Sequence, residues 1–154
     1  MEKAPFLPIL RELARCYQAF EMYSSAHLRT LGFTPPQFDI IATLGNTLGM
    51  TSKELGEKTL ITKGTLTGVV DRLIAKGLVK RTASPTDGRC QIVQLTKKGE
   101  TLFAKNFPLH IAHVQSAFTS FKTDDYAQIE TALRKIYDAF NLNHHKPTRI
   151  KGEV

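Results

Sequence analysis

Cysteine and long apolar runs are scarce in this chain of 154 residues. The two cysteines, Cys16 and Cys90, are too few for a disulfide scaffold. No stretch approaches the roughly 18 consecutive apolar residues of a membrane-spanning helix, which excludes a protein that crosses a membrane on helices. The first residues, Met1 to Pro5, lack the apolar run of a signal peptide, so we expect a cytoplasmic protein with no membrane partner.

The motifs of the common enzyme classes are missing too. The chain has no Gly-x-Ser-x-Gly elbow, phosphate-binding loop, Cys-x-x-Cys pair or His-Glu-x-x-His motif. His110 and His113 are spaced to share a metal, as are the neighbours His144 and His145. No Cys, Asp or Glu lies close in sequence to complete a zinc set. We therefore expect no enzyme activity, no cofactor and no metal site.

The chain does have an apolar core and an uneven positive charge. Hydrophobic residues make up 42% and charged residues 23%, which fits one folded domain and excludes disorder over most of the chain. The net charge is +7, and residues 50–100 alone carry ten basic and five acidic side chains. A local positive field of this kind favours nucleic acid over a membrane surface as the partner, although a merely solubilising surface is an alternative.

The hydrophobic periodicity predicts a mainly α protein of the α+β winged-helix kind. Thr34 and Thr51 each begin a capping box, Thr62 is a good N-cap, and Gly77 is placed to end a helix in the left-handed conformation. An Asp-Gly turn between two short extended runs, 78–82 and 90–95, predicts a two-stranded hairpin. The six helices are expected at residues 6–31, 35–44, 52–59, 63–76, 97–121 and 123–143.

The outward face of the helix at residues 63–76 has an unusual composition. Two glycines in one helix, Gly64 and Gly68, each cost about 1 kcal/mol relative to alanine. A helix that must lie close against a surface has a reason to accept that cost, because missing side chains let its backbone approach. The surface is expected to be the DNA major groove, with packing on the protein itself as the alternative. Asp71, on the same face, is expected to pair with a nearby Arg or Lys. The flanking side chains that reach phosphates or base edges are Lys63, Thr65, Thr67 and Arg72.

The predicted hairpin supplies a second surface of the same kind. Arg89 beside the Asp87-Gly88 turn lies at the end of an extended loop and is suited to a narrow minor groove. Lys80 and Arg81 at the base of the hairpin are suited to phosphates. A hairpin that follows a helix-turn-helix is typical of the wing of a winged helix.

Several short segments resemble the MarR family of bacterial transcription regulators. Residues 31–38 resemble that family's approach to its second helix, and residues 62–73 resemble its recognition helix. Residues 76–81 are similar to the exit from that helix. Asp87-Gly88-Arg89 matches an Asp-x-Arg wing signature, and residues 95–99 match a Leu-Thr-x-x-Gly signature. The resemblance covers roughly residues 6–141.

The resemblance implies a homodimer whose two winged helices read a pseudo-palindromic operator, with half-sites about 34–36 Å apart. It implies a repressor, released by a small ligand or an oxidant. The dimerisation region is then residues 1–34 and 97–143, the DNA-binding region 35–96, and 144–154 a flexible tail. A narrow apolar stripe on the last helix supports the dimer independently. The residues expected to contact DNA are Lys53, Thr62, Lys63, Gly64, Thr65, Thr67, Gly68, Arg72, Arg81 and Arg89, with Asp87, Gly88 and Arg89 forming the wing tip.

Two kinds of sensor remain open at this point. A small aromatic or phenolic effector is expected in a pocket that Phe20, Tyr23, His27 and Phe38 line, although such an apolar stripe also suits a core. Cys16 is the redox candidate, since in the hydroperoxide-sensing branch of the family a reactive cysteine lies in the first helix. The tyrosine expected four residues on is absent here, so we expect Cys16 to be a buried apolar cysteine and Cys90 a structural one.

A protein–protein adaptor is the competing functional class, with the winged helix used for a partner other than DNA. The charge pattern discriminates between the two classes. An adaptor needs neither a segment of net charge +5 nor a basic helix face lined with glycine.

Overall fold

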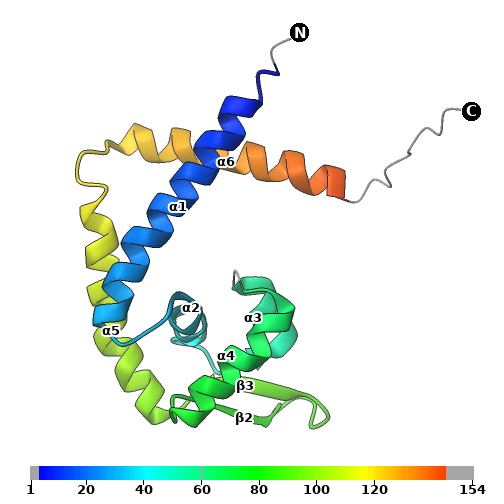
Figure 1. Ribbon diagram of the computed structural model, residues 1–154. Helices are drawn as coiled ribbons and strands as arrows, with labels where there is room; N and C mark the ends of the chain where they lie inside the picture. The colour runs from blue at the N-terminus through cyan, green and yellow to red at the C-terminus, as the bar shows by residue number, and fades with distance from the viewer. Residues whose placement is uncertain (1–3, 60, 145–154) are drawn as a thin grey trace, which may run out of the picture. The chain divides into compact units, whose positions relative to one another are not determined.

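A computed structural model describes residues 4–59 and 61–144 (Figure 1). The chain divides into two compact units, residues up to Gln115 and residues from Ser116 onward. The six expected helices are present among the described residues, with three short strands. None of the described helices has the length and apolar character that a membrane span requires.

The loop between the first two helices ends at a predicted capping box, which starts the second helix. Helix α1 spans Leu7–Thr30, and α2 spans Pro35–Leu44. The Thr34 hydroxyl accepts the backbone N–H of Gln37, and the Gln37 side chain accepts the N–H of Thr34, which confirms the predicted capping box.

The helix-turn-helix consists of α3 (Ser52–Lys58) and α4 (Lys63–Ala75). Thr51 and Glu54 form the second predicted capping box. Thr62 stands at the predicted N-cap position of α4, but its side chain accepts no backbone N–H of that helix. Its hydroxyl instead donates to Thr65 Oγ1 at 3.0 Å.

The hairpin belongs to a three-stranded antiparallel sheet. Strands β2 (Val79–Ala83) and β3 (Gln91–Leu95) pair over their whole lengths, with Arg81 opposite Val93. Strand β1 (Met50–Thr51) adds to the other edge of β3, giving the order β1-β3-β2. Sequence analysis misses β1, because two residues are too short to show an alternating pattern.

The core lies where α2, α3 and α4 pack on the sheet. All four residues predicted for the inward face of α4 are buried, as is Leu78. Leu78 follows Gly77, which comes after the Lys76 C-cap and has the left-handed conformation predicted for it, with a φ of 71°. The most deeply buried large side chains are Ile40, Ile41, Leu44, Leu55, Val70, Leu73, Val79 and Val93.

The Leu-Thr-x-x-Gly segment joins the sheet to α5 (Lys97–Ser116). The Thr96 hydroxyl donates to the Gly77 carbonyl at 2.7 Å and accepts the Gly99 N–H at 3.1 Å. A side chain at Gly99 would collide with the Leu78 carbonyl, so only glycine fits this close approach. These contacts tie the start of α5 to the end of α4.

Helix α5 ends five residues earlier than predicted, at Ser116 rather than Phe121. Residues 117–120 form turns, and the Thr119 hydroxyl donates to the Ser116 carbonyl at 3.3 Å. Ser and Thr hydroxyls that bond the backbone compete with helix propagation, which the hydrophobic pattern alone does not show.

The second unit is α6 (Thr123–His144) and the turn before it. The Asp125 carboxylate accepts the Lys122 N–H at 2.7 Å, so the helix begins where its acidic first turn predicts. The rings of Phe118, Phe121 and Tyr126 pack together around this start. Residue 144 of the predicted tail ends α6, and residues 145–154 lie outside the described residues.

Candidate nucleic-acid interface and effector cavity

The outward face of α4 is exposed within the unit that ends at Gln115. A Cβ added at Gly64 would meet nothing within 4 Å, and one added at Gly68 would meet only Arg72 Nη2, at 3.8 Å. No internal contact described in this unit therefore requires glycine at either position. Packing of this face on the protein itself does not explain the two glycines. The exposed side chains around them are Thr62, Lys63, Thr65, Thr67, Asp71 and Arg72, with Lys53 exposed on α3.

Asp71 pairs with an arginine, as expected. Its Oδ1 lies 2.8 Å from Arg81 Nη2 on β2. The two side chains are 54% and 33% exposed, so the pair stabilises the fold by at most about 1 kcal/mol. Its main effect is to hold the Arg81 guanidinium beside α4 and to offset the negative charge on this face.

The wing tip is held by its own polar side chains. Asp87 Oδ1 accepts the Arg89 N–H at 3.0 Å, and Ser84 Oγ accepts the N–H groups of Thr86 and Asp87. Asp87 of the Asp-x-Arg signature thus shapes the loop, while the Arg89 side chain is exposed. Arg81 lies within β2, where it pairs with Asp71 of α4, and Arg89 lies in the tip that follows, so the hairpin presents two arginines.

Cys90 lies just before the strand that the sequence predicts it to begin. It is exposed in the turn, one residue before β3 begins, and its Sγ lies 3.7 Å from Asp87 Oδ2. The negative charge of Asp87 raises the pKa of the Cys90 thiol above its ordinary value. A thiol of this kind is a poor nucleophile.

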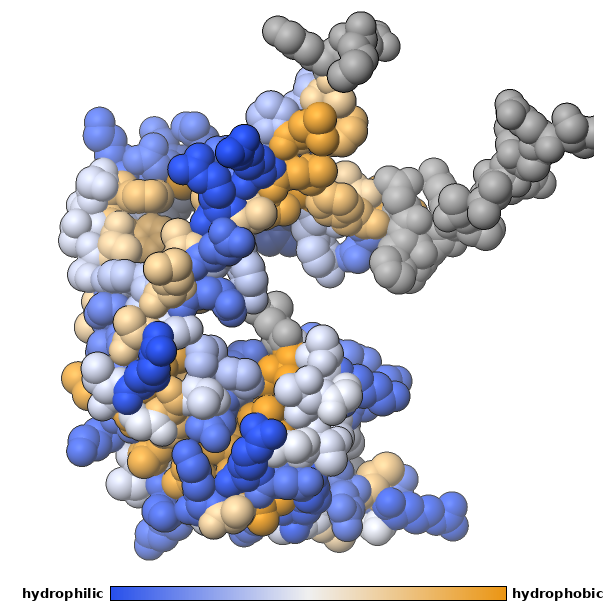
Figure 2. Space-filling model, in the orientation of Figure 1, coloured by the Kyte–Doolittle hydropathy of each residue, from blue (hydrophilic) through white to orange (hydrophobic). Residues whose placement is uncertain are grey.

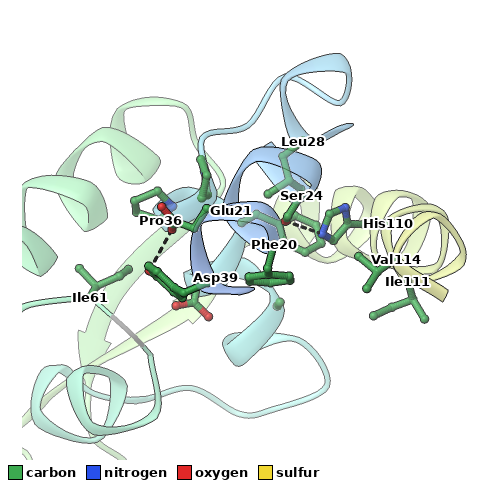
Figure 3. Close-up of a pocket in the computed structure, with 14 residues that line it drawn as sticks. Phe20, Glu21, Ser24, Leu28, Pro36, Asp39, Ile61, His110, Ile111 and Val114 are labelled. Atoms are coloured by element: carbon green, nitrogen blue, oxygen red, sulfur yellow. Dashed lines mark hydrogen bonds between the residues drawn. The ribbon is translucent and has the colours of Figure 1, made fainter. Parts of the chain in front are cut away.

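Helices α1, α2 and α5, together with Ile61 from the segment before α4, line a cavity of about 380 Å³ that opens to solvent (Figure 3). Phe20 and Phe38 line it, as predicted, but Tyr23 and His27 do not. At about 100° per residue, Tyr23 lies about 60° further around α1 than Phe20. His27 lies about 20° from Phe20 in angle but two turns further along the helix, where its ring stacks on His113 of α5. The lining residues are Tyr17, Phe20, Glu21, Ser24, Leu28, Pro35, Pro36, Phe38, Asp39, Ala42, Ile61, His110, Ile111 and Val114.

Tyr23 and His27 instead join two histidines of α5. The His113 ring stacks on both, at centroid distances of 4.3 Å to Tyr23 and 4.1 Å to His27. His27 Nδ1 lies 3.0 Å from His110 Nδ1, and His110 Nε2 lies 3.2 Å from Ser24 Oγ. Among the described residues, no group of three or more Cys, His, Asp or Glu is arranged to hold a metal ion.

This packing favours neutral imidazoles. Burial lowers the pKa of His110, and the nearby His27 and His113 lower it further. Burial also lowers the pKa of His27, followed by the effect of His113. A proton on both His27 and His110 would set two N–H donors against each other across their short contact.

We therefore expect the protein to lose stability as the pH falls through the histidine range. The unfolded chain, with an ordinary histidine pKa of about 6.5, binds protons more readily than the folded state, so stability declines as the pH falls below that value. Thermal melts should give a lower melting temperature at about pH 5.5 than at about pH 8. His110→Asn should flatten this dependence, because it removes the more deeply buried imidazole of the contact with His27. Equal melting temperatures in the wild type would contradict the assignment.

Cys16 is exposed on α1, which corrects the expectation of a buried cysteine. It lies on a helix whose apolar residues are largely exposed: Phe6, Leu7, Ile9, Tyr17, Phe20 and Met22 are each about half exposed or more. The 3.6-residue periodicity identifies an apolar face, but only its C-terminal end, with Leu28, is buried in the core of this unit. Figure 2 shows apolar side chains gathered at the start of α1.

The fold and the α4 surface together define a winged helix-turn-helix protein. The MarR family model matches residues 31–89. The HTH-type transcriptional regulator MhqR of Bacillus subtilis is 29% identical over 124 residues, covering 80% of this chain and 86% of MhqR. The chain belongs to the MarR family, and it is a DNA-binding transcription regulator rather than an enzyme.

Solved structures agree with this assignment. A mutant of Escherichia coli MarR in complex with operator DNA matches with a TM-score of 0.75 and 26% identity, covering 85% of this chain and 94% of that one. BpsR of Bordetella bronchiseptica, whose DNA binding is regulated by 6-hydroxynicotinic acid, matches with a TM-score of 0.77 and 25% identity, covering 90% and 99%.

Proposed function

We propose that the protein is a homodimeric repressor that binds a pseudo-palindromic operator and leaves it when a small molecule occupies the cavity. The observation that carries the proposal is the exposed face of α4, where two glycines lie between basic and hydroxyl side chains without any internal packing reason.

In this proposal α4 lies in the major groove of each half-site. Gly64 and Gly68 let the helix backbone approach, and the neighbouring hydroxyl and basic groups reach base edges and phosphates. Arg81 contacts phosphate from the position that Asp71 gives it, and Arg89 enters the minor groove. The other proposed contacts are Lys53, Thr62, Lys63, Thr65, Thr67 and Arg72.

The homodimer is proposed from the apolar surface that each unit leaves exposed. On α6 the predicted stripe is present, and four of its five members are between 43% and 56% exposed. Large apolar patches of this kind mark interaction surfaces. We assign residues 1–34 and 97–143 to dimerisation and 35–96 to DNA binding. The stripe consists of Tyr126, Ile129, Leu133, Ile136 and Phe140.

The cavity is proposed as the effector site because of the elements that form it. Its walls join α1 and α5, assigned to dimerisation, to α2 of the DNA-binding region. A ligand that binds one arrangement of these helices better than another shifts the protein toward that arrangement. BpsR, whose DNA binding is regulated by a small aromatic acid, is a precedent for such control in a related fold. An oxidant is the second candidate signal, favoured by the exposure of Cys16.

Binding to the protein's own upstream DNA, compared with random duplex across a salt series, tests the proposal. We expect selective binding whose logarithm falls linearly with the logarithm of salt concentration, by about 0.9 per phosphate neutralised. Addition of small aromatic compounds or of peroxide to the complex then identifies the releasing signal. Equal and weak binding to both duplexes would instead favour a protein–protein adaptor, which uses its winged helix for a partner other than DNA.

Arg89→Ala should weaken operator binding by about tenfold or more, because one good base or groove contact contributes about 1–3 kcal/mol. The wing should keep its shape, since Asp87 bonds the backbone N–H of residue 89 and not its side chain. Arg29→Ala removes an arginine from the last turn of α1, where it donates to the Ser25 carbonyl, and serves as the control. An unchanged affinity in the Arg89 variant would show that the wing tip does not contact DNA.

A further inference from the structure

The charged groups on the cavity wall are all acidic. Glu21 from α1 and Asp39 from α2 line the cavity, and no lysine or arginine is among the described lining residues. Figure 3 shows both carboxylates among the side chains that surround the space. The formal charge of this wall is therefore negative, in a protein whose net charge is +7. A positive charge in the ligand would be attracted to this site, and a negative one repelled.

The start of α2 also offers nothing to an anion. A helix N-terminus ordinarily binds anions through its free backbone N–H groups. Here the first two residues of the helix, which line the cavity, are Pro35 and Pro36, and proline has no N–H. The next N–H, that of Gln37, is taken by Thr34 Oγ1. The usual anion-binding donors of a helix start are thus absent from this wall.

The remaining polar groups are neutral. Burial keeps the pKa of His110 low, so its imidazole does not supply a positive charge near pH 7. The Tyr17 hydroxyl donates to Glu21 Oε1 at 3.0 Å, and this hydrogen bond raises the pKa of Tyr17. Phe20 and Phe38 add aromatic faces, which attract cations as well as apolar rings.

We propose that the cavity binds a small aromatic cation, an amine or amidine on a ring, with Glu21 and Asp39 as its counter-charges. The volume of about 380 Å³ is in the range of pockets for small organic ligands. This inference rests on the proposed effector role of the cavity and narrows its ligand class. It sets this chain apart from BpsR, whose regulator, 6-hydroxynicotinic acid, is an aromatic acid.

Calorimetric titration of the full chain with benzamidine and with benzoate tests the inference, because the two probes share a ring and differ in charge sign. We expect benzamidine to bind at least about tenfold more tightly than benzoate, a modest ratio for one charge contact in a partly buried site. The variant Glu21→Gln with Asp39→Asn should lose about tenfold in benzamidine affinity and gain or keep affinity for benzoate. As the control, Glu12→Gln removes a carboxylate of α1 that pairs with Arg15 and does not line the cavity. This variant should change neither the benzamidine affinity nor the benzoate affinity.

The outcomes separate this inference from the proposed function. Equal or tighter binding of benzoate, binding of neither probe, or an unchanged benzamidine affinity in the folded double variant would overturn the inference. Melting curves establish that the variant is folded. If benzamidine binds as expected but leaves the operator complex intact, the ligand class stands and the regulatory role of the cavity fails.

Discussion

Replacing Gly64 with leucine is expected to abolish operator binding and to leave the protein folded. A Cβ at this position meets nothing within 4 Å, so the larger side chain projects into open space. Glycine inside a helix costs about 1 kcal/mol relative to alanine or leucine, so the variant should be slightly more stable than the wild type. The same side chain would hold α4 away from the groove floor. Affinity should fall toward the non-specific level, by about 10³-fold or more.

The combination of raised stability and lost binding is what makes this variant informative. Most variants that lose DNA binding by unfolding show a lowered melting temperature, whereas here it should rise or stay constant. Ala104→Leu places the same side chain on an exposed face of α5, outside the proposed interface with DNA, and should keep full operator affinity. Gly64→Ala should give an intermediate loss, because it adds one methyl group. Full affinity in a folded Gly64→Leu dimer would show that α4 does not approach DNA closely.

Local signals make most of the winged helix predictable from sequence. Capping boxes at Thr34 and Thr51 set two helix starts, and Gly77 sets a helix end to within one residue. Each of these signals acts over three or four residues, so it is present in full in the sequence. The salt bridge of Asp71 is predictable for the same kind of reason, since a carboxylate on a basic face has few other partners.

Features that depend on tertiary contacts are not visible in the sequence. Strand β1 exists because Met50 lies opposite Val93, a pairing across more than forty positions that no local pattern shows. His27 contacts His110 and His113 because α1 and α5 lie against each other. Sequence spacing alone does not show whether His27 makes this contact or lines the cavity. The apolar face of α1 predicts a buried Cys16, but periodicity identifies such a face without saying what covers it.

The exposed apolar stripe of α6 leads to the second large effect. The double substitution Ile129→Asp with Leu133→Asp is expected to convert the proposed dimer to monomers and to abolish operator binding. Both side chains are exposed within their unit, at 43% and 50%, so their replacement removes little packing inside one chain. In the proposed dimer they lie in the interface, where unpaired carboxylates are strongly unfavourable. A dimer holds two winged helices at fixed spacing, and its loss should lower affinity by about 10²–10⁴-fold.

The decisive comparison is with a charge placed on the other side of the same helix. Thr131→Asp introduces a carboxylate between the two positions in sequence but about 160° away from each around α6, off the apolar stripe. Sedimentation and operator titration should show a dimer of full affinity for Thr131→Asp and a helical monomer without specific binding for the double variant. If the double variant remained a dimer, α6 would not form the interface, and the exposed face of α1 would be the surface to substitute next.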